Sequence, residues 1–152
     1  MNEGLKLALS GDVVALPVLA TVVGSILRHN PGVSLEVCVW TRAGLPADFT
    51  AGRLRVEFRE ASEKWGAGGG RFPVEMFDKF EVVTAKPEWS RCLMWGWDMV
   101  CKGDLSELWE SHVAGKCGAF VDGRRGKRRG SWEWDDRLPR ESGGGMLSAL
   151  VV

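Results

Sequence analysis

The sequence predicts an α/β fold, in which a mixed, mostly parallel sheet is flanked by helices. An apolar, strand-like run at Leu5–Leu9 is followed by a helical pattern over Ala15–His29, and a second strand pattern covers Ser34–Thr41. A strand, a helix and a strand in this order favour parallel strands joined through a helix. The 152 residues, 45% of them hydrophobic, match one domain with a core of its own, so we treat 1–152 as a single domain.

The first three elements carry clear boundary signals. Ser10-Gly11-Asp12 is a turn after the first strand, Pro17 suits the first turn of the helix, and Asn30-Pro31-Gly32 ends that helix. The helix is apolar almost all round, which predicts burial on every side. In the strand Ser34–Thr41, alternate residues predict two distinct faces, one with Leu35, Val37 and Val39 and the other with Glu36, Cys38 and Trp40.

The middle of the chain is less regular. A loop containing Pro46 leads to a strand at Leu54–Phe58, and Glu60–Arg71, with its GAGGG run, reads as a mobile loop. A helix is expected from Pro73 to about Lys86, with Phe77, Phe80 and Val83 on one face. Pro87 ends it, and Arg91–Trp97 is a further apolar strand.

The last part of the chain begins with a capping box. Asp104 can accept a hydrogen bond from the backbone and Glu107 lies three positions on, so a short helix is expected over Leu105–Ser111. Strands are expected at Cys117–Asp122 and Met146–Val152. A second mobile loop is expected near 123–141.

Composition excludes several classes of function. The formal net charge is +0, so no overall field attracts nucleic acid or an acidic membrane. The apolar run Val13–Leu27 is about 15 residues, too short to cross a bilayer, and no signal peptide is recognisable. The four cysteines form no CxxC pair, which argues against zinc and favours reduced thiols in a soluble, cytoplasmic protein.

One region is similar to a known family. Lys102-Gly103-Asp104-Leu105-Ser106-Glu107-Leu108-Trp109, followed by Gly118-Ala119-Phe120-Val121-Asp122, resembles the family 8 glycosyltransferases of the GT-A fold. The opening Leu7–Asp12, the apolar helix and Arg28-His29-Asn30-Pro31 resemble that family's first strand, loop and helix more loosely. The resemblance covers most of the chain in order and spacing, and implies sugar transfer from a nucleoside-diphosphate sugar, with UDP as the expected nucleotide and retention of anomeric configuration.

The resemblance also implies a set of site residues. Asp98 would bind Mn²⁺ or Mg²⁺, Ser10, Gly11 and Asp12 would contact the nucleotide, Lys79 would steady the diphosphate and Asp122 would bind the donor sugar. Hard carboxylate oxygens suit these cations, and a lysine suits a phosphate as a point charge. Three of these residues have a plainer alternative: Asp98 can simply end a strand, Asp12 can cap the next helix, and Lys79 can be a solvated side chain.

The sequence departs from the family pattern in three places, two of which concern the metal site. The Asp-X-Asp position reads Gly96-Trp97-Asp98, so the first aspartate is missing. Ser142–Met146 contains no asparagine where the family has Asn-X-Gly, and a histidine ligand from the family's C-terminal part has no counterpart before Val152.

Two other segments carry partial signals of a binding site. Five basic residues crowd into 123–130 and could attract phosphate or an anionic acceptor, but a solvated loop is the commoner role of such a run. The nearby Glu133, Asp135 and Asp136 oppose nucleic acid. Gly66–Gly70 lacks the Lys-Ser/Thr that a phosphate loop needs.

The sequence therefore leaves three functional hypotheses. The first is a glycosyltransferase that uses a nucleoside-diphosphate sugar and an unknown acceptor. The second is a catalytically degenerate domain that binds a nucleotide or a protein partner, and the third is a fragment of a longer enzyme. The sugar, the acceptor and the oligomeric state stay open.

Overall fold

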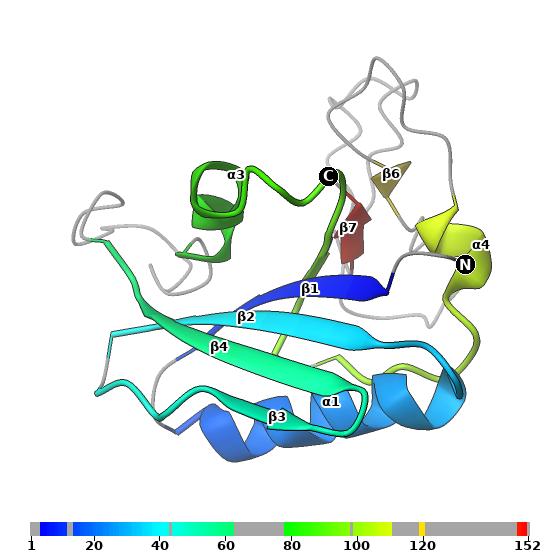
Figure 1. Ribbon diagram of the computed structural model, residues 1–152, viewed down its shortest axis with the longest axis horizontal. Coiled ribbons are helices and arrows are strands. Elements are labelled where there is room, and N and C mark those ends of the chain that lie inside the picture. The colour runs from blue at the N-terminus through cyan, green and yellow to red at the C-terminus, as the bar shows by residue number, and fades with distance from the viewer. Residues whose placement is uncertain are drawn as a thin grey trace, which may run out of the picture.

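The computed structural model describes residues 4–11, 14–42, 44–62, 78–97 and 99–110, together with the backbone of 119–120 and 149–151. These residues form one sheet with helices on both faces (Figure 1). Four parallel strands make its centre: β1 (Leu5–Ser10), β2 (Leu35–Thr41), β4 (Leu54–Glu60) and β5 (Leu93–Trp95). Three short strands, β3 (Phe49–Ala51), β6 (Ala119–Phe120) and β7 (Ala149–Val151), add antiparallel partners in the order β3-β4-β2-β1-β5-β7-β6. The predicted mixed, mostly parallel α/β sheet is confirmed.

Helix α1 (Leu16–His29) covers one face of the sheet. It buries Leu19, Val22, Val23 and Ile26, which are spaced so that they line one side of the helix. The prediction of a helix buried all round is therefore wrong. Pro17, Ala20 and Gly24 lie on the exposed side, and small apolar residues there mimic a buried pattern in the sequence.

The opposite face carries two short turns of helix, η2 (Lys79–Glu81) and α3 (Val82–Ala85). The expected helix began at Pro73, but residues 71–77 lie outside the described part of the chain. Of the predicted apolar face, Phe80 does pack against the core on this side, whereas the prediction is wrong at Val83, which is 60% exposed while Val82 is buried at 2% exposure. The 3₁₀ turn over Lys79–Glu81 winds more tightly than an α-helix and brings Val82 onto the sheet instead.

The two faces of β2 contribute to two separate core clusters, as the alternation of residues along this strand predicted. Leu35, Val37 and Val39 join the cluster beneath α1, while Cys38 and Trp40 join the cluster beneath η2 and α3. Helix α4 (Ser106–Trp109) places Trp109 in the first cluster and is shorter than the predicted Leu105–Ser111. The Asp104 carboxylate, one residue before the N-cap position Leu105, accepts the Ser106 backbone N–H at 2.7 Å and the Ser106 hydroxyl at 2.6 Å.

Candidate functional site at the carboxyl edge of the sheet

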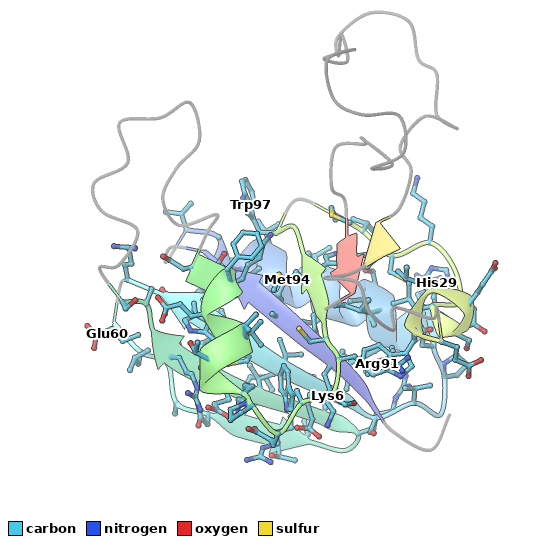
Figure 2. All side chains as sticks on the ribbon, turned by 90° about the horizontal axis from the view of Figure 1, so that it is seen from above. Lys6, His29, Glu60, Arg91, Met94 and Trp97 are labelled. Carbon is cyan, nitrogen blue, oxygen red and sulfur yellow. The ribbon has the colours of Figure 1, made fainter. Side chains whose placement is uncertain are left out.

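The four parallel strands end at the same edge of the sheet. Figure 2 shows Glu60 at the end of β4 and Trp97 beyond the end of β5, with Lys6 near the opposite edge where β1 begins. In open α/β sheets, ligands bind outside the carboxyl ends of the strands. Ser10 and Gly11, two of the predicted nucleotide-binding residues, lie at this edge, where β1 ends.

Ser10 and Gly11 form the first loop of the site. Both are buried, and the Gly11 backbone N–H donates to the Trp40 carbonyl at 3.0 Å, which holds the loop against the end of β2. A Cβ atom at position 11 would lie 2.8 Å from the Cβ of Ala15, so only glycine lets the loop pass this close to the start of α1. Asp12, the third residue predicted here, lies outside the described residues.

Lys79 lies at the same edge. Its Nζ atom donates to the Trp95 carbonyl at 3.0 Å, so its positive charge is held at the last residue of β5. Gly96 and Trp97 follow directly, and Trp97 is 43% exposed. Lys79 therefore lies next to the segment that contains the predicted metal ligand, Asp98.

An ion pair that the sequence analysis did not identify lies beside Lys79. Arg42, the first residue after β2, donates from Nε and Nη2 to the two carboxylate oxygens of Asp78 at 2.9 and 2.7 Å. Asp78 is 1% exposed, and Arg42 also donates to the Ser62 carbonyl at 3.2 Å. A two-pronged pair of this kind is among the stronger ion pairs in proteins. The one sequence feature that could have indicated this pair is the basic residue Arg42 directly after a buried strand.

Glu81 completes the polar contacts of the edge. Its Oε1 atom accepts the backbone N–H of Ser62 at 2.9 Å and the Ser62 hydroxyl at 2.5 Å. Ser62 follows the end of β4, so this contact ties the helical segment to a third strand end.

The predicted metal site lies mostly beyond the described residues. Asp98 and Asp122 are both outside them, as is the basic segment near 123–141. Within the described ranges, no group of three or more His, Cys, Asp or Glu side chains is suited to a metal ion. The Gly96 backbone N–H contacts the Met99 sulfur at 3.3 Å. Mn²⁺ or Mg²⁺ binding by Asp98 thus stays a prediction.

The described thiols at Cys38 and Cys92 are unsuited to covalent chemistry. Burial raises the pKa of both side chains to about 12, and the Glu57 carboxylate adds to the effect at Cys38. A neutral thiol is a poor nucleophile and a poor metal ligand. Both residues pack in the cluster beneath η2 and α3, as small hydrophobic side chains.

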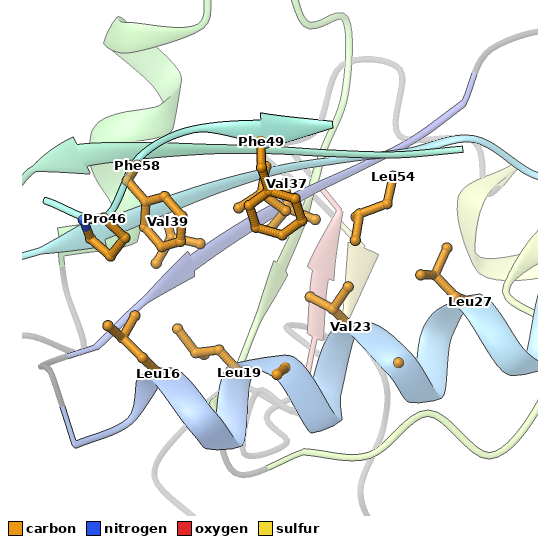
Figure 3. Close-up of a pocket in the computed structure, with 13 residues that line it drawn as sticks. Leu16, Leu19, Val23, Leu27, Val37, Val39, Pro46, Phe49, Leu54 and Phe58 are labelled. Carbon is orange, nitrogen blue, oxygen red and sulfur yellow. The ribbon is translucent and has the colours of Figure 1, made fainter. Parts of the chain in front are cut away.

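A separate hollow lies on the other face of the sheet, between α1 and the β3–β4 hairpin (Figure 3). Its volume is about 390 Å³ and its lining is apolar, with Val23, Val37 and Phe49 among the contributing residues. Among the described residues, no charged side chain lines it. A nucleoside diphosphate needs charged or polar partners, so this hollow does not compete with the carboxyl edge as a donor site.

Comparison with known proteins defines the class of fold. No family model matches the sequence, and no curated protein matches it. The arrangement of strands and helices is that of the GT-A-like glycosyltransferases. Among the described residues, no helix is long and apolar enough to cross a membrane.

Particular solved structures carry this similarity. The chain is similar to the Q189E active-site mutant of LgtC, with a TM-score of 0.70 and 12% identity over 97% of this chain and 57% of that one. A structure of the galactosyltransferase LgtC with donor and acceptor sugar analogues gives a TM-score of 0.61 and 12% identity over 72% of this chain and 43% of that one. The glycosyltransferase GlyE of Streptococcus pneumoniae TIGR4 gives 0.63 and 15% identity over 99% of this chain and 34% of that one. The chain thus spans little more than half of the LgtC mutant's length and about a third of GlyE's.

Proposed function

We propose that this domain binds a nucleoside-diphosphate sugar, with UDP as the nucleotide, at the carboxyl edge of its sheet and transfers the sugar to an acceptor. The observation that carries the proposal is the position of Lys79 at the end of β5, on the edge that also holds the Ser10–Gly11 loop. The LgtC structure that this fold resembles was determined with donor and acceptor sugar analogues. The resemblance to family 8 further suggests retention of anomeric configuration.

The chemistry asks the protein to stabilise a leaving diphosphate. Lys79 supplies a positive charge, and the buried Ser10–Gly11 loop supplies a rigid wall against the base or ribose, with Asp12 as the polar group. Asp122 is assigned to the hydroxyl groups of the donor sugar. Asp98 would hold Mn²⁺ or Mg²⁺ together with water and the donor's phosphates, and such an ion neutralises charge on the diphosphate.

A specific observation favours a second candidate, a non-catalytic domain that binds a nucleotide. Gly96 stands where the family has its first aspartate, and it offers no oxygen from a side chain. A single carboxylate makes a weak metal site, although Mg²⁺ often relies on water and phosphate for its other ligands.

Calorimetric titration with UDP, with and without Mn²⁺, separates these candidates. Binding that Mn²⁺ strengthens supports the transferase, and binding that is independent of metal supports the nucleotide-binding domain. Absence of UDP binding under both conditions would reject both. Hydrolysis of a panel of nucleotide sugars would then identify the donor.

Three variants sharpen the test. Lys79→Ala should weaken UDP binding by about tenfold to a hundredfold, the range expected for a lost charged hydrogen bond. Arg28→Ala removes an exposed charge from the last turn of α1, near the opposite edge of the sheet, and should leave UDP binding unchanged. Gly96→Asp should make UDP binding more dependent on Mn²⁺, and no change would contradict the assignment of Gly96-Trp97-Asp98 to the metal motif.

A further inference from the structure

The segment Asp78–Glu81 is tied by three side chains to the ends of three parallel strands. Asp78 pairs with Arg42 after β2, Glu81 accepts two hydrogen bonds from Ser62 after β4, and Lys79 donates to the carbonyl of Trp95 in β5. Figure 1 shows η2 and α3 lying over one face of the sheet. The three contacts fix this segment across the edge where the donor site is proposed.

The contact between Arg42 and Asp78 is the most restrictive of the three. Two nitrogen–oxygen distances, 2.9 and 2.7 Å, set both the position and the orientation of the Asp78 carboxylate. Asp78 directly precedes Lys79 in the chain. An ion pair that fixes the side chain of residue 78 therefore restricts the backbone from which the Lys79 side chain extends.

The same pair also controls the local charge. A buried, unpaired carboxylate one residue from Lys79 would repel a diphosphate and offset the lysine's attraction. With Arg42 in contact, the charges of Arg42 and Asp78 cancel at short range. Glu81 is the other acidic side chain of the segment, and it is directed to the Ser62 backbone and hydroxyl groups.

We propose that Arg42 and Asp78 are positioning residues that hold Lys79 for a diphosphate and neutralise the carboxylate beside it. This inference rests on the proposed function. It goes further, because neither residue is expected to touch the ligand and their effect passes through Lys79.

A double-mutant cycle on UDP binding tests the inference. Asp78→Asn should weaken UDP binding about tenfold in the protein with Lys79. In a Lys79→Ala background, the same substitution should change the dissociation constant by less than about twofold, because the group being positioned is absent. Arg42→Lys keeps the positive charge but not the two-pronged contact, so its loss should be smaller than that of Asp78→Asn.

A matched control uses another ion pair on the same helical segment. Lys86, directly after α3, pairs with Glu57 of β4, at the other end of the segment from Lys79. Glu57→Gln should lower the melting temperature yet leave UDP binding within about twofold of the original, since it breaks a structural tie that does not carry Lys79.

The outcomes distinguish this inference from the proposed function. If the unmodified protein does not bind UDP, both fail. If Lys79→Ala weakens binding but Asp78→Asn and Arg42→Lys do not, the positioning role is wrong and the proposed site stands. Equal losses from Asp78→Asn with and without Lys79 would also overturn the inference. If Asp78→Asn does not fold, the same cycle with Arg42→Lys decides the question.

Discussion

Asn30 joins the end of α1 to the segment before α4, and replacing it tests how the fold is held together. Its side chain is buried, at 4% exposure. The Nδ2 atom donates to the Ile26 carbonyl at 2.8 Å, and the Oδ1 atom accepts the Leu105 backbone N–H at 2.8 Å. Leu105 is 75 residues away in the chain, so this contact ties the end of α1 to the segment before α4, next to the Ser25 hydroxyl, which accepts the Cys101 backbone N–H at 2.9 Å.

The loss of stability in Asn30→Ala depends on which hydrogen bonds the partners of the Asn30 side chain keep. The Ile26 carbonyl still accepts the backbone N–H of Asn30 at 3.0 Å, so the loss there is small. The Leu105 N–H belongs to a buried residue and loses its acceptor, which costs about 1–3 kcal/mol. We expect the free energy of unfolding to fall by about 2 kcal/mol, equivalent to about 4–8 °C in Tm for a domain of this size.

Urea unfolding followed by circular dichroism measures this change directly. Arg28→Ala, two residues earlier on the exposed side of α1, serves as the control and should stay within about 0.5 kcal/mol of the original protein. If Asn30→Ala costs no more than that control, then water or a rearranged loop satisfies the Leu105 amide, and the Asn30 side chain does not hold α1 to this segment.

Three further predictions concern stability. Gly11→Ala should cost about 1–3 kcal/mol in urea unfolding, because its new Cβ meets that of Ala15, and adding Ala15→Gly should recover part of the loss; a neutral Gly11→Ala would show that the loop yields easily. Gly24→Ala should stabilise the protein by about 0.5–1 kcal/mol, because a Cβ there meets open space on the exposed side of α1, and a lower Tm would contradict this. Burial raises the pKa of the Cys92 thiol from its ordinary value of 9.0 to about 12, so between these values the native state keeps a proton that the unfolded state releases. The stability that this neutral thiol supports is complete below about pH 9 and is lost as pH rises toward 12, by about 1.4 kcal/mol per pH unit within that window. Between pH 8 and pH 10.5, the free energy of unfolding should fall less in Cys92→Ala than in the original protein. An equal fall in both proteins would show that the Cys92 thiol does not cause this pH dependence.

The sequence predicted the β1–α1–β2 unit closely. The predicted strand Leu5–Leu9, helix Ala15–His29 and strand Ser34–Thr41 each lie within one residue of the observed element at either end. Hydrophobic periodicity carries this information, because these elements bury whole faces against their neighbours. The Lys102–Trp109 motif pointed to the GT-A-like fold that the solved structures share.

Strand β3 was missed, although its turn has a recognisable signal. Gly52 has a φ of 58° and, with Arg53, forms the two-residue turn between the paired Ala51 and Leu54. A glycine-containing pair between strand-forming residues is typical of a hairpin. The nearby Pro46 and the short length of Phe49–Ala51 favoured a loop instead.

Patterns between near neighbours in the sequence were enough to predict the class of fold and the order of its main strands. The side of α1 that faces water, the packing of Val82 rather than Val83 on the sheet, and the contact between Arg42 and Asp78, 36 residues apart, became visible in the folded structure. Contacts of that kind depend on how separate elements pack together, and a pattern along one stretch of chain does not encode their geometry.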